Sequence, residues 1–360
     1  MQLKRGAMSN KILKYVRAII FVAVIVGLVK SMDFAMMPSG YIRYIIHAAG
    51  NSDEKEGYDC IILGASHGRT SINPEYMIDS GYAKNPLNMC IPGESVVNSY
   101  YLLKEACRNN DVKKVVLEMD YQYWINDEAR DSEFGDLFEY VQLPMSKVKL
   151  EYIGNELFTK DFRTVYFKKL AYTDDFGSVG NNIKTKLSKA YRNYDMEAVE
   201  VRDADGPYIG RGFFYREKID KKGDFWVCDW SEDDISDKVL AYFQKIVKYC
   251  NDNGIELVCI TEPITPTAVV NGPSEQANTY LQKICRQNNV RYIDFTLLKK
   301  DVLKVTDDDF CDWEGHMYGE LANRFSHILS QVLVEPQNEW FYGTYAQLEQ
   351  AVYENYVTKQ

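Results

Sequence analysis

The apolar residues of the chain follow two patterns, short continuous runs and longer stretches at helical spacing. Five short apolar runs have the length and the Val and Ile content of buried strands: 59–64, 86–91, 113–120, 255–263 and 290–295. Longer stretches carry apolar residues at helical spacing: about 95–108, 234–254, 274–289 and 319–333. Strands that alternate with helices indicate a parallel sheet with helices on both faces. The pattern therefore predicts an α/β domain.

One long interval, 121–232, breaks this alternation. It is rich in Tyr, Phe, Lys and Asp, and its letters GPYIGRGFFYREK at 206–218 are typical of a hairpin or of irregular structure. We interpret the interval as an insertion after the third strand. Two roles are open: it caps a functional site and selects the substrate, or it elaborates the fold without substrate contact. The last residues, 335–360, form a tail with a helical pattern.

The N-terminus carries an uninterrupted apolar run at 18–29, with five basic residues before it and Lys30 after it. Extended from Tyr15 to Met37, the segment is long enough to cross a bilayer. No small-residue cleavage site follows closely, so residues 1–37 predict an uncleaved signal-anchor rather than a cleaved signal peptide or a soluble core helix. The positive-inside rule then predicts a single-pass protein of the cell membrane, with its C-terminal domain extracytoplasmic. A polar linker is expected at 38–57, before the main domain at 58–334.

Charge separates the N-terminus from the rest of the chain. The first 30 residues hold six basic residues and no acidic one, and removing these six from a total of 42 leaves 36 basic against 52 acidic residues, a net charge of −16. Such a surface repels phosphate backbones, which excludes nucleic acid as a partner. The 27 tyrosines suit broad amphipathic surfaces such as those that contact glycans, although half-buried structural positions explain them equally well.

Candidate chemistry begins at the carboxyl end of the first strand, where the functional groups of open α/β sheets collect. Ser66 follows that strand by a short turn, and a serine hydroxyl needs a base to become a nucleophile. Of the four histidines, His316 is the best base, because it lies in a polar loop before the last helix. Asp312 or Glu314 would orient its ring, with Asp312 preferred. The alternative is that Ser66 is only a turn or cap residue.

An oxyanion site requires donors beside the serine. The turn after the second strand supplies Asn88 and Gly93, and glycine permits a close backbone approach. We therefore expect the amides of Ser66 and Gly93, with Asn88, to form the oxyanion hole. Arg69 is a candidate for binding an anionic substrate, and equally for a helix cap or a salt bridge.

Patterns for metals, cofactors and disulfides are weak. Asp307–Asp309 lacks the glycine and glutamate of a calcium loop, and Cys311 with Asp312 and His316 lacks a further zinc ligand at useful spacing. The sequence contains eight cysteines without a C-x-x-C pair, so buried free thiols are the expectation, with one disulfide open. We expect no metal and no cofactor.

These blocks together resemble the SGNH/GDSL hydrolase superfamily. The family's serine block is similar to "GAS" at 64–66, its glycine block to "NMCIPG" at 88–93, and its acid and histidine block to "DWEGH" at 312–316. The context "HMYGELANRFS" is similar to the "HLNxxGAxxFS" pattern of membrane-anchored members, which include teichoic-acid D-alanyl-transfer proteins and polysaccharide O-acetyltransferases. The resemblance covers about 60–120 and 255–333. It implies a flavodoxin-like three-layer fold and a Ser-His-Asp site.

The sequence departs from the family pattern at two places. The family's third block ends in an asparagine that stabilises the oxyanion, whereas the third strand here ends in "LEMDYQYW", with Glu118 or Asp120 in that place. The common D-x-x-H spacing would also put the acid at Trp313.

The resemblance implies an extracytoplasmic serine acyltransferase or esterase that acts on O-acyl groups of a cell-surface or extracellular glycan. Its partners would be the membrane, the glycan or another acylated cell-envelope polymer, and a membrane-bound acyltransferase. The alternative is a catalytically inactive SGNH-like scaffold that binds a cell-envelope polymer or such an acyl-transfer partner.

Overall fold

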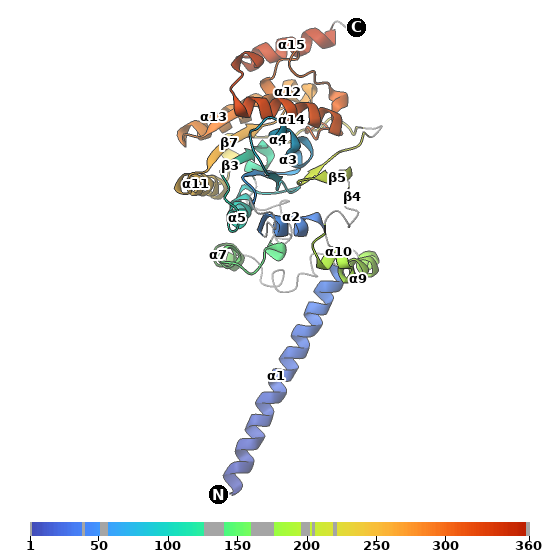
Figure 1. Ribbon diagram of the computed structural model, residues 1–360, viewed down its shortest axis with the longest axis vertical. Helices are drawn as coiled ribbons and strands as arrows, with labels where there is room; N and C mark the ends of the chain where they lie inside the picture. Colours follow the sequence, from blue (N-terminus) through green and yellow to red (C-terminus); the bar gives the residue numbers. More distant parts are fainter. Residues whose placement is uncertain are drawn as a thin grey trace. The chain divides into compact units, whose positions relative to one another are not determined.

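The computed structural model describes residues 2–37, 40–50, 57–125, 140–159, 176–195, 202–203, 206–218 and 222–357 (Figure 1). The chain divides into two compact units. The first contains Met1–Gly40 and Ile153–Val199, and the second contains Tyr41–Tyr152 and Glu200–Gln360. Part of the predicted insertion therefore belongs with the N-terminal helix, and the rest returns to the sheet domain.

The first unit is built on the long helix α1 (Gln2–Met36). Its segment Ile12–Met36, 25 residues, is long and apolar enough to cross a membrane, which confirms the predicted apolar helix by length and composition. Near its end, Asn182 of α9 (Val179–Leu187) donates to the Met36 carbonyl at 3.0 Å, and Lys186 donates to the Phe34 carbonyl at 2.6 Å. These bonds satisfy carbonyls that a helix C-terminus leaves open. The other elements are η3 (Leu157–Thr159), η5 (Phe176–Ser178) and α10 (Lys189–Arg192).

The second unit is a mixed α/β domain around a five-stranded parallel sheet in the order β2-β1-β3-β7-β8. Each strand lies within a predicted one: β1 (Cys60–Leu63), β2 (Pro86–Asn88), β3 (Lys114–Glu118), β7 (Glu256–Thr261) and β8 (Arg291–Asp294). Strand β1 lies between β2 and β3, so residues that follow β1 lie between the ends of these two strands. This arrangement confirms the predicted parallel sheet.

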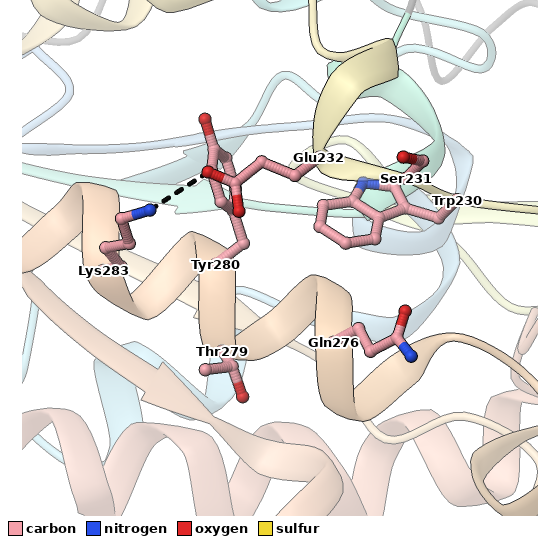
Figure 2. A pocket seen from close by; sticks show the side chains of 7 residues that line it. All are labelled: Trp230, Ser231, Glu232, Gln276, Thr279, Tyr280 and Lys283. Atoms are coloured by element: carbon pink, nitrogen blue, oxygen red, sulfur yellow. Dashed lines mark hydrogen bonds and ion pairs between the residues drawn. The ribbon is translucent and has the colours of Figure 1, made fainter.

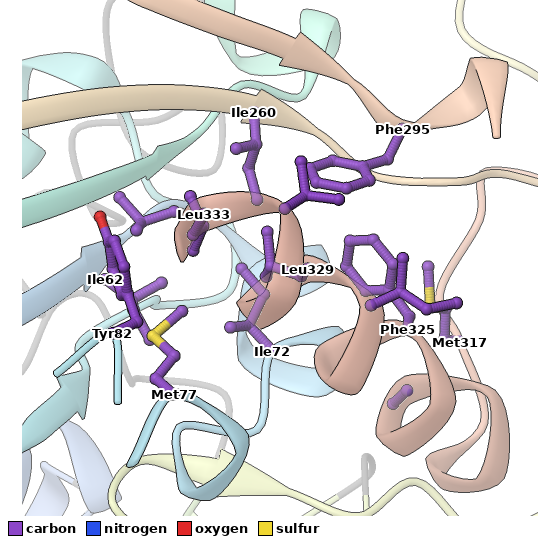
Figure 3. Close-up of a cluster of buried hydrophobic side chains, with 14 of the residues drawn as sticks. Ile62, Ile72, Met77, Tyr82, Ile260, Phe295, Met317, Phe325, Leu329 and Leu333 are labelled. Atoms are coloured by element: carbon purple, nitrogen blue, oxygen red, sulfur yellow. The ribbon is translucent and has the colours of Figure 1, made fainter. Parts of the chain in front are cut away.

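Helix α14 (Gly319–Val334) packs on one face of the sheet (Figure 3). Its Phe325, Leu329 and Leu333 contact a buried cluster that includes Ile62 of β1 and Ile260 of β7. The short helices α3 (Ser66–Ser71) and α4 (Glu75–Asp79) contact α14. On the other face, α5 (Val96–Ala106) contacts β1 and α11 (Asp237–Asp252) contacts β7.

Three further features differ from or refine the sequence prediction. The expected linker contains α2 (Tyr41–Gly50), which buries Tyr44, Ile45 and Ile46 and contacts α5. Residues 206–218 form the expected hairpin, with β4 (Arg202–Asp203), β5 (Gly206–Gly210) and β6 (Phe213–Phe214) in an antiparallel sheet. The eight cysteines, all of which lie in the described residues, form no disulfide with one another. The remaining elements are η1 (Tyr121–Trp124), α7 (Lys147–Asn155), η6 (Glu232–Asp234), α12 (Pro266–Asn271), α13 (Ser274–Gln287), η7 (Phe295–Leu297), η8 (Asp307–Asp309), η9 (Asn338–Trp340) and α15 (Tyr345–Val357).

Candidate active site

Ser66 is the first residue of α3, immediately beyond the turn that ends β1. Gly64 has a φ of +152°, and a Cβ on it would lie 2.6 Å from the Cβ of Glu118, so the turn requires glycine. The Glu118 carboxylate accepts a hydrogen bond from the Ala65 amide at 2.8 Å. These contacts fix the backbone that carries Ser66. The first amides of a helix have no intrahelical acceptor, so the Ser66 amide remains suited to bind an oxyanion.

His316 lies within hydrogen-bond reach of Ser66, although 250 positions separate them in sequence. Its Nε2 is 2.7 Å from Ser66 Oγ, and its Nδ1 is 2.7 Å from Asp312 Oδ2. An ionised carboxylate only accepts, so Nδ1 carries the hydrogen and Nε2 has the lone pair that accepts the serine proton. The three side chains therefore form a continuous Ser-His-Asp chain of hydrogen bonds in the direction that nucleophile activation needs.

A turn at Gly315 brings the Asp312 carboxylate to the imidazole of His316. The Asp312 Oδ1 accepts from the amides of Gly315, at 3.0 Å, and His316, at 3.2 Å. Gly315 has a φ of +116°, and a Cβ there would lie 2.7 Å from Ile264, so no other residue fits without displacement. The turn absorbs the one residue by which the spacing exceeds D-x-x-H. The structure thus brings Asp312, and not Trp313, to the imidazole.

The protonation states follow from these contacts. Partial burial would raise the pKa of Asp312, but its hydrogen bonds with His316 hold that pKa well below the usual range. Burial and the nearby positive charge of His67 lower the pKa of His316, against the opposing effect of Asp312. His316 is therefore a neutral base, and Asp312 a carboxylate, at neutral pH.

Glu314, the alternative acid, is not part of the hydrogen-bonded Ser-His-Asp chain. It borders a small buried cavity together with His67 and Asp120, and burial raises its pKa. Within the part of the chain that the structure describes, the carboxylate bonded to His316 Nδ1 is that of Asp312.

Tyr123 is a site residue that sequence reasoning missed. Its hydroxyl is 3.2 Å from Ser66 Oγ, and it comes from η1, at the start of the predicted insertion. Because the single serine hydrogen goes to His316, Tyr123 must be the donor of this bond. Burial and the charge of Asp120 raise the pKa of Tyr123 far above neutrality, so it keeps its proton. The phenol thus supplies a hydrogen-bond donor beside Ser66 Oγ.

The two acids at the end of β3 do not face the serine hydroxyl. Glu118 accepts from the Ala65 amide, and Asp120 forms an ion pair with the neighbouring His67. Burial and the charge of Asp120 raise the pKa of Glu118 to about 7. Both groups act on the residues that flank Ser66.

Asn88 has a different role from the one predicted. Its side-chain amide donates to the carbonyls of Gly68 and Ile72, both at 2.8 Å, and its oxygen accepts from the Cys90 amide at 2.9 Å. Both amide hydrogens are therefore used, and none is left for an oxyanion. Asn88 instead ties α3 to the end of β2. Gly93 has a φ of +67°, which favours glycine, and its oxyanion role stays a prediction.

Arg69 is not placed to bind an anionic substrate, which was one of the roles predicted for it. The residue is 3% exposed, and its guanidinium carbon lies 4.8 Å from the ring centre of Tyr41 and 4.6 Å from that of Phe214. This position holds the arginine inside the domain by stacking on aromatic faces. A contact with an anionic substrate, as predicted, does not fit such a burial.

The candidate residues do not fit a metal. The donor atoms of His67, Glu118 and Asp120 lie within 4.8 Å of one another, as do those of Cys311, Asp312 and His316. In the second set, the Asp312–His316 hydrogen bond occupies a nitrogen that a metal would need. In the first, the Nδ1 of His67 is likewise paired with the Asp120 carboxylate.

A surface pocket of about 350 Å³ lies apart from the triad (Figure 2). Trp230 and Tyr280 line it with ring centres 5.7 Å apart, and Lys283 pairs with Glu232 at 3.0 Å. None of its lining residues belongs to the triad. Within the triad, Ser66 is 9% exposed, and the side chains of His316 and Asp312 are 13% and 35% exposed.

Comparison with known proteins adds nothing to this geometry. No family model matches the chain, and no curated protein does. The resemblance to the SGNH superfamily therefore stays an interpretation of the motifs.

The role found for Asn88 predicts a large loss of stability in Asn88→Ala. The residue is fully buried, and the substitution removes three hydrogen bonds. The Ile72 carbonyl and the Cys90 amide lose their Asn88 partner, whereas the Gly68 carbonyl keeps its bond from the Ile72 amide. We expect the free energy of unfolding to fall by about 3 kcal/mol or more. Chemical denaturation of the full chain in detergent measures it. Asn323→Ala is the control, because it loses one partly buried bond to Asn73, and we expect it to cost about 1 kcal/mol. An equal cost for the two variants would contradict the structural role of Asn88.

Proposed function

We propose that this chain is a membrane-anchored serine acyltransferase or esterase that acts on O-acyl groups of a cell-surface or extracellular glycan. One observation carries the catalytic part: Ser66 Oγ, the His316 ring and the Asp312 carboxylate are joined by two hydrogen bonds of 2.7 Å each. The membrane part is supported by the apolar helix in α1. The choice of a glycan as substrate rests on the motif resemblance, since the chemistry of the triad requires only an acyl ester.

In the first half of the reaction, Ser66 Oγ forms a bond to the acyl carbonyl carbon while its proton passes to His316 Nε2. The carbonyl electrons move onto oxygen, which gives a tetrahedral oxyanion. Its collapse breaks the bond to the leaving alkoxide, which takes the proton from His316. In the second half, water or a sugar hydroxyl gives its proton to His316 and attacks the acyl-serine, and Ser66 regains the proton. Asp312 stabilises the imidazolium in both halves.

The oxyanion would be stabilised by the Ser66 amide, the Gly93 amide and the Tyr123 hydroxyl. The oxyanion and Ser66 Oγ share one carbon in the tetrahedral intermediate, so a donor 3.2 Å from Oγ lies beside both atoms. The hydrogen bond that the Tyr123 hydroxyl donates would shift from the serine oxygen to the oxyanion as charge develops there. This role makes the third-block asparagine unnecessary.

Tyr123→Phe is therefore expected to lower kcat while KM changes little. Removal of one oxyanion donor reduces kcat by about 10²-fold to 10³-fold in other acyl-transfer enzymes. Steady-state kinetics with an activated ester measures both constants. Tyr121→Phe is a matched control on the same turn, because its hydroxyl donates to the Cys228 carbonyl, away from Ser66, and should keep kcat near the wild-type value. A Tyr123→Phe enzyme with unchanged kcat would remove the phenol from the oxyanion site.

The proposal is tested by labelling the purified full chain in detergent with a fluorophosphonate probe. An activated serine displaces fluoride and forms a stable bond from Oγ to phosphorus, and peptide mass spectrometry locates the adduct. We expect a single adduct on the peptide that contains Ser66 and none on the heat-denatured protein. A folded protein that takes no label at Ser66 would instead favour the inactive scaffold that binds a cell-envelope polymer.

A further inference from the structure

A second histidine lies against the ring of His316. The imidazole of His67 stacks on it, with ring centres 4.0 Å apart and an angle of 17° between the planes. His67 follows Ser66 in the first turn of α3, and it is 5% exposed. Its Nδ1 forms an ion pair with the carboxylate of Asp120. The site therefore contains two His-Asp pairs, of which only one bonds to the serine.

The surroundings of His67 are acidic. Three carboxyl groups come from separate elements: Glu118 at the end of β3, Asp120 before η1, and Glu262 after β7. Glu314 also interacts with the His67 charge, from the loop that carries His316. Burial disfavours a charged imidazole, but Asp120 and then Glu118 and Glu262 outweigh it and raise the pKa of His67 to about 10. His67 is thus a cation at neutral pH.

A small polar cavity borders the same imidazole. Its volume is about 20 Å³, sufficient for one water molecule. His67 Nε2, Ser274 Oγ and Asn278 Oδ1 are buried, border this cavity and have no hydrogen-bond partner among the described residues. A water molecule there would accept from the second N–H of the imidazolium. Such a water molecule would give Nε2 of a protonated His67 a partner, while its Nδ1 is ion-paired with Asp120.

We propose that His67, held as an imidazolium by Asp120, is a positioning residue that keeps His316 neutral before serine attack and makes it a stronger acid afterwards. The inference rests on the proposed function of Ser66, His316 and Asp312. It assigns a role to the histidine of "GASHG", which the triad leaves unused.

The charges around His316 give this effect a definite sign. Asp312 bonds to its Nδ1 and favours the protonated ring, as does the more distant Asp120. The uncharged hydroxyls of Ser66 and Tyr123 face its Nε2 side. The His67 imidazolium stacks on the ring and disfavours a second positive charge at this distance. Protonated His316 is consequently more ready to pass its proton to the leaving alkoxide.

The inference is tested by NMR of histidine labelled with ¹³C at Cε1 in the full chain in detergent. The chain has only four histidines, so the His67 and His316 signals can be assigned by single substitutions. In the wild type, we expect His67 to stay protonated beyond pH 9 and His316 to titrate below its ordinary pKa of about 6.5. In His67→Gln, the His316 titration should move upward by about one pH unit. The acid limb of kcat/KM should move by the same amount.

His327→Gln is the matched control. It removes another histidine, on α14, whose ring contacts Tyr76 and Gln331, and it should leave the His316 titration unchanged. The inference would be overturned if His67 of the wild type loses its proton near pH 6.5. It would also be overturned if His316 titrates at the same pH in His67→Gln as in the wild type. The first of these results does not depend on whether the variant folds. If His316 shifts as expected but the wild type takes no fluorophosphonate, the charge coupling stands and the proposed enzymatic function fails.

Discussion

Replacement of Ser66 by alanine is expected to abolish fluorophosphonate labelling and to lower ester turnover by roughly 10⁶-fold, to the level left by binding alone. The reason is that no other hydroxyl lies 2.7 Å from the Nε2 of His316 within the described residues. The substitution removes one small polar group whose bonds are to His316 and Tyr123, so the fold should persist. Labelling and initial rates of the two proteins, with circular dichroism of each, measure the effect.

Ser71→Ala provides the matched control for this experiment. Ser71 is the last residue of the same helix, α3, but its hydroxyl donates to Glu262 at 2.5 Å and does not reach His316. We expect this variant to retain labelling at position 66. If Ser66→Ala keeps the label and Ser71→Ala loses it, the nucleophile has been assigned to the wrong serine.

The sheet and the positions of the two main catalytic groups follow from sequence pattern. The inner strands β1, β3 and β7 are largely apolar runs because both faces of a parallel sheet are covered, and this signal does not depend on distant contacts. Ser66 was found from its position after the first strand, and His316 from its position in the loop before the last helix. Both positions are fixed by the order of elements along the chain, which is why local pattern was sufficient.

The supporting groups depend on geometry that pattern does not contain. Asp312 reaches the imidazole because Gly315 adopts a positive φ, and a spacing rule that counts residues misses such a turn. Asn88 occupies the predicted place, but its hydrogen bonds go to the backbone of α3. Tyr123 lies in a segment read as an insertion, where neither period nor motif marks a functional residue.

Sequence alone does not link His67 to the triad, because neighbouring residues usually point in different directions. In α3, however, Ser66 and His67 occupy the first turn, where one side chain meets Nε2 of His316 and the next meets the face of its ring. The pairing of His67 with Asp120 required the end of β3 to lie beside β1, a neighbour relation that the strand order establishes. Sequence adjacency and spatial adjacency therefore coincide here for a reason that only the sheet order reveals.

Asp312→Asn is expected to lower kcat by about 10⁴-fold without unfolding the protein. An asparagine can turn its NH₂ group to Nδ1, which stabilises the tautomer with the hydrogen on Nε2, and that tautomer cannot accept the proton of Ser66. The variant also loses the charge that stabilises the imidazolium. Initial rates with an activated ester, with thermal unfolding as the check on structure, measure the effect.

Glu314→Gln distinguishes the role of Glu314 from that of Asp312. Like Asp312→Asn, it converts a carboxylate to an amide, but two residues further along the loop. The Glu314 carboxyl borders the buried cavity beside His67, whereas the bond to His316 Nδ1 comes from Asp312. We therefore expect kcat of this variant to stay close to that of the wild type. A loss in Glu314→Gln as large as that in Asp312→Asn would move the orienting role to Glu314. It would also mean that the loop rearranges when substrate binds, since the hydrogen bond to Asp312 would then have to break before serine attack.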